Sequence, residues 1–220
     1  MEILIIHYNT PELTAATVRS VWKQTPEAVV TILDNSGNYA GPANFVLRNH
    51  IDFDAFLLKY PDRLWTSNEW GSAKHCFSVD YCFEYEPRGF ILLDSDVLVK
   101  KDLSPLWTQE VAWCGQVETK FRKEGCVRRL LPYLCYINVP MCKKYGVRYF
   151  NDKFMWKLNT NPNIPASNKY DTGAYFLRET ADLPHKEVPI YDYIVHYGGA
   201  SYNQKRESKE WLEKHSYLYI

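Results

Sequence analysis

The chain has 220 residues, of which 46% are hydrophobic and 24% charged, an ordinary globular composition that excludes disorder for the bulk of the protein. Its formal net charge is zero, which argues against a protein that wraps nucleic acid. Six cysteines form no Cys-x-x-Cys pair, so the sequence predicts neither a zinc site nor a disulfide framework. The length suits one large domain with a sizeable core.

The chain opens on a short apolar run, Ile3–Ile6, which is typical of a buried strand. A helix is expected next, over residues 11–24. Thr10 is a candidate N-cap, and Pro11 suits the first helical position.

The β-branched and apolar residues 28–33 predict a second strand, which ends at Asp34. A strand, helix and strand of this size form a right-handed parallel unit almost without exception. We therefore expect Asp34 to lie at the same sheet edge as residues 7–9, which follow the first strand.

The pattern between the second strand and the central strand is weaker. We expect a helical turn or two over residues 53–58, a short third strand over 63–67, and a helix over 72–85 that Pro87 stops.

The central strand is the apolar run Phe90–Leu93, which leads directly into Asp94 and Asp96. Carboxylates at the end of a parallel strand lie where open α/β sheets bind ligands. Two ionised carboxylates this close repel each other, and a divalent cation holds both, with Mg or Mn favoured by oxygen ligands. The alternative is that one of the two aspartates only caps the next turn.

The remaining expectations follow in chain order. Residues 102–107, 140–145, 172–180 and 203–215 are expected to be helical, whereas 111–117, 133–139 and 188–197 are expected to be strands. The run 120–129 holds five basic residues and one acidic residue, and is read as a solvated loop or as a contact to a phosphate or an anionic membrane. The polar stretch 151–169 is a candidate lid.

The first residues contain no basic leader and no apolar stretch of signal-peptide length, and no window approaches the length of a spanning helix. These features predict a cytoplasmic location. Peripheral contact with the inner face of a membrane stays open.

Five motifs in order resemble the GT-A glycosyltransferases, especially the family 2 group and its bacterial rhamnosyltransferase-like members. They are His7-Tyr8-Asn9 after the first strand, Leu33-Asp34-Asn35-Ser36-Gly37, Asn68 with Gly71, Asp94-Ser95-Asp96, and His196-Tyr197-Gly198-Gly199-Ala200-Ser201. The resemblance covers nearly the whole chain and implies an α/β fold with a mostly parallel central sheet flanked by helices. It implies a single GT-A domain over residues 1–220, with a nucleotide-binding half at 1–100 and an acceptor-facing half at 101–220.

By this resemblance, the first two loops embrace a nucleotide, so that Tyr8 is a candidate for stacking on the base and Asp34 for binding the base or ribose. Asp94, Asp96 and His196 resemble the metal ligands of such enzymes. His7 is the weaker candidate for a functional histidine. The other residues that the resemblance implies for donor binding are Asn9, Asn68, Gly71, Ser95 and Gly199.

Asp171 resembles the catalytic base that removes the proton of the acceptor hydroxyl, with Asp152 in reserve. Family members commonly carry a Glu-Asp pair there, whereas Lys169–Ala174 holds a single acid, so Asp171 is also a candidate helix N-cap.

The resemblance implies a metal-dependent enzyme, using Mn or Mg, that moves a hexosyl or deoxyhexosyl group from a nucleotide-diphosphate donor to a hydroxyl of a glycan or lipid-linked glycan. Inversion at the anomeric carbon and a role in bacterial surface polysaccharide synthesis are implied in the same way. Two alternatives stay open. A nucleotidyltransferase also needs acidic residues and Mg at a sheet edge, although a glycine-rich phosphate loop is missing after the first strand, and a non-catalytic carbohydrate-binding protein could keep the fold.

Overall fold

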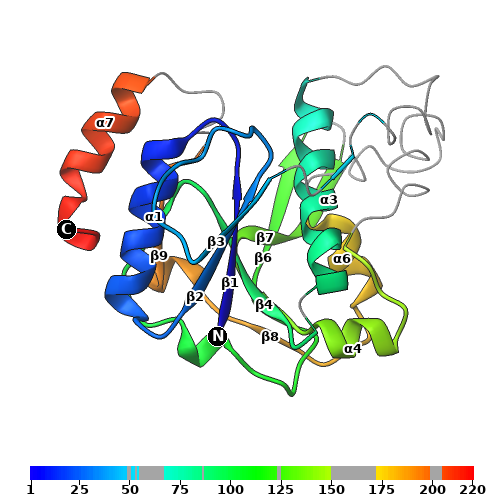
Figure 1. The fold of residues 1–220 in the computed structure, drawn as a ribbon. Coiled ribbons are helices and arrows are strands. Elements are labelled where there is room, and N and C mark those ends of the chain that lie inside the picture. Colours follow the sequence, from blue (N-terminus) through cyan, green and yellow to red (C-terminus); the bar gives the residue numbers. More distant parts are fainter. Residues whose placement is uncertain are drawn as a thin grey trace.

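The computed structural model describes residues 1–48, 51–52, 54, 67–85, 87–122, 125–149, 172–198 and 205–220. One mixed sheet lies between two groups of helices (Figure 1). One face is covered by α1 (Pro11–Gln24) and, outside it, α7 (Lys205–Lys214). The other face is covered by α3 (Ser67–Tyr85), α4 (Val139–Lys144) and α6 (Ala174–Glu179). The predicted α/β class is confirmed.

The central sheet has seven strands in the order β3-β2-β1-β4-β7-β6-β8. Their bounds are β1 Glu2–His7, β2 Val29–Asp34, β3 Phe45–Arg48, β4 Phe90–Asp94, β6 Trp113–Arg122, β7 Gly125–Ile137 and β8 His185–Glu187. Four of the six neighbouring pairs are parallel, and the pairs of β7 with β4 and with β6 are antiparallel. The sheet is therefore mostly parallel, as predicted.

The strands β1 and β4 are buried on both faces, which explains their unbroken apolar sequences. Successive side chains point to opposite faces. In β1, Ile3 and Ile5 pack in the cluster that includes Val18 and Val21 of α1. Leu4 and Ile6 pack in the other cluster, which includes residues of α3 and α6.

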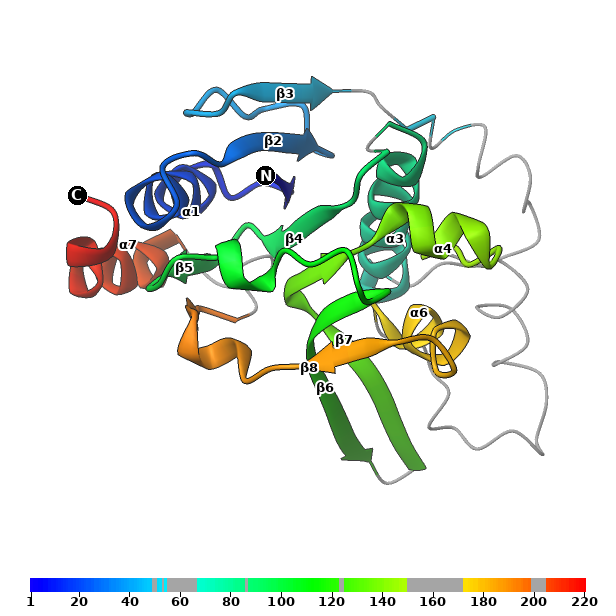
Figure 2. The same ribbon diagram turned by 90° about the horizontal axis from the view of Figure 1, so that it is seen from below.

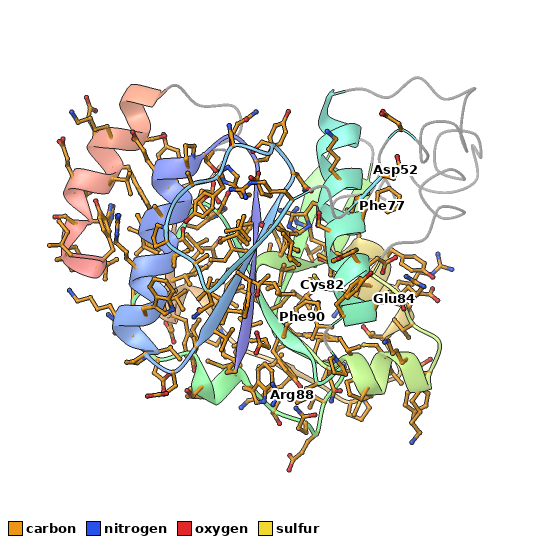
Figure 3. All side chains as sticks on the ribbon, viewed as in Figure 1. Asp52, Phe77, Cys82, Glu84, Arg88 and Phe90 are labelled. Carbon is orange, nitrogen blue, oxygen red and sulfur yellow. The ribbon has the colours of Figure 1, made fainter. Side chains whose placement is uncertain are left out.

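The C-terminal end of α3 packs against the start of β4, at the end of that strand opposite to Asp94 (Figure 3). The aromatic ring of Phe83 meets that of Phe90 edge to face, with centroids 6.1 Å apart. Cys82 lies in the same cluster as Phe90, between α3 and β4 (Figure 3). This packing fixes the direction in which α3 runs toward the other end of the sheet.

A second, two-stranded sheet joins β5 (Val97–Val99) to β9 (Ile194–His196) in antiparallel register. It packs beside α1, whose Thr17 donates its hydroxyl to the carbonyl of Val97 at 2.7 Å. Figure 2 shows β5 next to α1, to one side of β4. The late part of the chain is thereby joined to the segment that directly follows β4.

Some sequence expectations are corrected. The structure has a strand at Phe45–Arg48 that was not expected. The strand expected over 63–67 lies outside the described residues except for Ser67, which begins α3. The expected strand 188–197 is broken, because Pro189 lacks an N–H for a ladder and a 3₁₀ turn, Ile190–Asp192, separates β8 from β9. Except for Asp54, the expected turn over 53–58 lies outside the described residues, as does the candidate lid over 151–169.

Two further expectations differ at the level of local structure. The basic run 120–129 belongs to a β-hairpin, because its described residues form the end of β6 and the start of β7. Thr10 stands at the N-cap position, but its hydroxyl makes no cap hydrogen bond. It lies 3.1 Å from the hydroxyl of Ser95 instead. None of the helices that the structure describes has both the length and the apolar character needed to cross a bilayer.

Candidate metal and donor site

Asp94 is the last residue of β4 and points toward α3. Alternation along the strand places it on the same face as Phe90 and Leu92, which pack in the cluster of α3. There His75 of α3 brings its Nε2 to 3.1 Å from the carboxylate Oδ1 of Asp94. His75 was missed at the sequence level, because the helical pattern gives no sign that this position lies above the end of β4.

Asp96 is placed by the turn between β4 and β5 and is buried. The register of the small sheet pairs Val97 with His196, so His196 lies beside the residue that directly follows Asp96. The His196 Nε2 atom is 3.3 Å from Asp96 Oδ1. The backbone carbonyl of Asp96 also accepts the N–H of Tyr197 at 2.9 Å, which ties the two segments together.

Asp94, Asp96 and His196 converge, since one ligand atom from each lies within 4.8 Å of the other two. Two carboxylates and one imidazole fit a divalent ion such as Mn²⁺, because carboxylates suit Mg²⁺ and Mn²⁺, and a neutral imidazole is a ligand for transition metals. Three ligands from the chain would leave coordination positions of such an ion for phosphate oxygens, which Mg²⁺-type ions commonly take. The geometry brings together the three residues predicted as ligands.

The electrostatics around Asp94 keep its carboxyl ionised. Burial alone would raise its pKa. The hydrogen bond from His75 and the electrostatic interactions with His75, His196 and Arg129 outweigh that effect and hold the pKa of Asp94 below its ordinary value. A carboxylate that is ionised before a cation arrives is the form that binds one.

Ser95 fixes the Asp94–Asp96 turn to the start of α1. Its hydroxyl lies 3.1 Å from that of Thr10, and its carbonyl accepts the hydroxyl of Thr17 at 3.0 Å. A direct contact of Ser95 with a donor stays a prediction.

Asp34 ends β2 level with His7 of β1, as the predicted shared edge requires. Its Oδ1 accepts the backbone N–H groups of Ser36 at 3.0 Å and Gly37 at 2.8 Å, and its Oδ2 accepts that of Tyr39 at 2.9 Å. Although burial opposes ionisation, these hydrogen bonds lower the pKa of Asp34. The Asp34 carboxylate therefore holds the loop after β2 through these hydrogen bonds. Its contact with a base or ribose stays a prediction.

The loop after β1 is bonded to the loop after β2. Asn9, at a φ of 56°, donates its backbone N–H to the Ser36 hydroxyl at 3.2 Å and accepts the side-chain amide of Asn38 at 3.0 Å. His7 is buried between Thr14 at 2.7 Å and Asn38 at 3.0 Å, and burial lowers its pKa. These contacts give His7 a packing role in the two loops.

Tyr8 is half-exposed at the tip of this pair of loops, and the ammonium of Lys74 lies 5.7 Å from its ring centroid. Burial lowers the pKa of Lys74. A half-exposed aromatic ring beside an amino group is compatible with the predicted stacking of a base next to phosphates.

The other predicted residues are placed only in part. Asn68 and Gly71 belong to α3, whose backbone is described there. Asp152, Asp171 and Gly199 lie outside the described residues. The segment that follows Asp171 packs against β7. A Cβ on Gly173 would lie 2.2 Å from the Leu130 carbonyl oxygen.

No protein-family model matches the sequence, and no curated protein matches it significantly. Among solved structures, the chain is similar to the galactosyltransferase LgtC in complex with donor and acceptor sugar analogs, with a TM-score of 0.60, 14% identity, and coverage of 99% of this chain and 95% of that one. It is also similar to the bifunctional glycosyltransferase WbbM, with a TM-score of 0.52 and 12% identity over 86% of this chain and 39% of that one. An active-site mutant of LgtC matches at a TM-score of 0.51 and 12% identity, over 86% of this chain and 73% of that one. The chain therefore has the GT-A glycosyltransferase fold.

Proposed function

We propose that the protein is a glycosyltransferase that uses a nucleotide-diphosphate sugar and a divalent metal ion. The observation that carries the proposal is the convergence of Asp94, Asp96 and His196 within 4.8 Å at the carboxyl end of β4. That edge is where α/β sheets of this kind bind their ligands. The fold shared with LgtC, whose structure holds donor and acceptor sugar analogs, supports the same conclusion.

In the reaction, an acceptor hydroxyl oxygen attacks the anomeric carbon of the donor. The bond between that carbon and the diphosphate oxygen breaks, and the nucleoside diphosphate leaves with the bonding electrons. A metal ion at this site supplies Lewis-acid stabilisation of the diphosphate charge. The ammonium of Lys74 lies 5.7 Å from the ring centroid of Tyr8, and we propose that it would add positive charge near the same leaving group.

The finer parts of the proposal rest on the family resemblance. They are Mn²⁺ or Mg²⁺ as the ion, inversion with Asp171 as the base and Asp152 in reserve, and transfer of a hexosyl or deoxyhexosyl group to a glycan or lipid-linked glycan. Bacterial surface polysaccharide synthesis, at the cytoplasmic side of a membrane and with peripheral contact, belongs to the same proposal. The division into a nucleotide-binding half and an acceptor-facing half at residue 100 is also proposed.

The proposal is tested by calorimetric titration of UDP, dTDP and GDP into the protein with and without Mn²⁺. The same titrations are run on Asp96→Asn and on a matched control, Asp182→Asn, whose carboxylate is exposed. We expect one nucleotide to bind only with Mn²⁺, binding to be lost in Asp96→Asn, and the control to behave as wild type. Absence of nucleotide binding under every condition would overturn the proposal.

Turnover then separates the enzyme from its alternatives. With the nucleotide sugar that corresponds to the bound nucleotide, a glycosyltransferase releases free nucleoside diphosphate when an acceptor is present. A binding protein releases none, and a nucleotidyltransferase makes pyrophosphate from a nucleoside triphosphate and a sugar phosphate. The anomeric configuration of the product, read by NMR, decides inversion separately.

A further inference from the structure

A charged side chain is buried close to the candidate metal site. The side chain of Arg129, on β7, is only 5% exposed, and its charge acts on Asp94. Its Nε donates to Glu118 Oε2 of β6 at 3.0 Å, and its Nη2 donates to the hydroxyl of Tyr133 at 2.9 Å. Burying a guanidinium is unfavourable unless it is paired and hydrogen-bonded, and Glu118 and Tyr133 meet both conditions for Arg129.

Tyr133 carries this arrangement to His196. The two rings are stacked, with centroids 3.8 Å apart and planes 30° from parallel. The guanidinium carbon of Arg129 lies 5.6 Å from the Tyr133 ring centroid, so Arg129 holds the ring by its hydroxyl and contacts its face. The imidazole of His196 is in turn 3.3 Å from Asp96. A continuous chain of contacts therefore runs from Glu118 to a candidate metal ligand.

The local fold explains how the hairpin delivers these side chains. Glu118 and Arg129 face each other as directly paired residues of β6 and β7. Between Gly115 and Val117 of β6 the register with β7 shifts, opposite the segment that contains Pro132. Bulges re-aim side chains and tolerate proline, which has no N–H for the ladder. Tyr133 directly follows that proline.

We infer that Glu118, Arg129 and Tyr133, here called the hairpin clamp, fix the imidazole of His196 in the orientation in which Nε2 faces Asp96. The clamp residues are positioning residues, because they reach the metal site through His196. The consequence for metal affinity rests on the proposed function. Partners that orient a metal-binding histidine commonly contribute tenfold to 100-fold to affinity.

The alternative is that the clamp only stabilises the hairpin. In that case its loss lowers the free energy of unfolding but leaves His196 in place. The two readings differ in what they predict for the imidazole itself, and that can be measured in the protein without metal.

The experiment uses Tyr133→Leu, which removes the stacked ring, and Arg129→Met, which removes the bonds to Glu118 and Tyr133. Tyr133→Phe keeps the ring and loses only its hydroxyl. Arg128→Met is the matched control, because the neighbouring Arg128 side chain is 66% exposed and lies 4.0 Å from the Glu187 carboxylate, at the limit of an ion pair. Circular dichroism and thermal unfolding confirm that each variant is folded at the measuring temperature.

Two readouts are taken on each folded variant. The first is the NMR shift of the His196 ring protons in metal-free protein, assigned with His196→Gln. The second is the dissociation constant for Mn²⁺ alone, from the electron paramagnetic resonance signal of the free ion. We expect Arg129→Met, which keeps the Tyr133 ring, to change the His196 shifts. The shifts of Tyr133→Leu do not enter the comparison, because deleting the ring removes its ring current wherever His196 lies. Both should bind Mn²⁺ about tenfold more weakly or worse, while Tyr133→Phe lies between them and wild type, and Arg128→Met matches wild type.

The outcomes separate the clamp from the proposed function. If the His196 shifts of folded Arg129→Met and the Mn²⁺ affinities of folded Arg129→Met and Tyr133→Leu match wild type, the clamp is overturned and the metal site stands. If wild type binds no Mn²⁺, the proposed metal site fails. The His196 shifts of Arg129→Met then decide the clamp, which is supported if they move and overturned if they do not.

Discussion

Two parts of the molecule bring residues to the candidate site in different ways. In the first part, the parallel strands β1, β2 and β4 end at one edge of the sheet. The polar residues of the candidate site end or directly follow each of these strands. In the second, β6, β7 and β9 reach the site through a hairpin with a register shift and through a short strand far along the chain. Local sequence patterns reveal the first kind of placement, whereas the second depends on pairing between distant segments.

The sharpest test of this comparison asks whether the late strand completes the site. His196→Ala should lower Mn²⁺ affinity by about 100-fold or more, as Asp96→Asn should, because each removes a ligand and even indirect partners contribute tenfold to 100-fold. His185→Ala is the control, since His185 is an exposed histidine on β8 that stacks on Trp113. Equal Mn²⁺ affinity of His196→Ala and wild type would restrict the site to the parallel strands.

The parallel part should depend most on its central strand. Leu92 of β4 is fully buried, so Leu92→Ala should lower the free energy of unfolding by about 3 kcal/mol through lost contacts and a residual cavity. Leu47→Ala makes the same change on the partly buried edge strand β3 and should cost about 1 kcal/mol. Urea unfolding measures both, and similar losses at the two positions would contradict the placement of the core around β4.

In the second part, the turn before α6 is tightly packed against the hairpin. Gly173 has a φ of +87°, and a Cβ there would lie 2.2 Å from the Leu130 carbonyl oxygen. Gly173→Ala should therefore cost about 2 kcal/mol or more, because it adds a clash to the backbone strain.

Gly146→Ala separates the two contributions. Gly146 has a φ of +68° and nothing within 4 Å of the added Cβ, so only strain of about 1 kcal/mol applies. Thermal unfolding of both variants gives the difference, and equal losses would show that the turn is free to move away from β7.

The smallest expected effect concerns the loop after β2. The pKa of Asp34 is lowered in the folded protein, so its ionised carboxylate contributes stability above the ordinary value of about 3.9 and loses it as pH falls through the lower folded value. The difference in unfolding free energy between wild type and Asp34→Asn should shrink as pH falls from 5 toward 3, with the exposed Asp182→Asn as control. If urea titrations give the same difference in unfolding free energy at every pH, the hydrogen bonds from the loop to the Asp34 carboxylate do not lower its pKa as described.

Much of the parallel part could be predicted from sequence because its signals are local. The apolar run that ends at Asp94 indicates a buried strand, and the alternation along it fixes the face on which Asp94 lies. The edge strand Phe45–Arg48 was missed because it is short and only partly buried.

The rest of the site could not be predicted, for a different physical reason. His75 reaches Asp94 only because α3 crosses the sheet above that residue, and no local pattern encodes the crossing. Arg129 sat in a basic run that is typical of a solvated loop, although the pairing of Glu118 with Arg129 across the hairpin neutralises and buries it. An acidic residue eleven positions before an arginine was the available signal, and it gains meaning only once the hairpin register is known.

The most direct test of the central claim is a crystal structure of the wild-type protein with Mn²⁺ and the nucleoside diphosphate that calorimetry selects. An anomalous difference map then locates the ion without reference to activity. We predict one strong peak bound by Asp94, Asp96 and His196, with diphosphate oxygens completing its coordination. A nucleotide bound with no manganese at these three residues, or manganese bound elsewhere, would contradict the account.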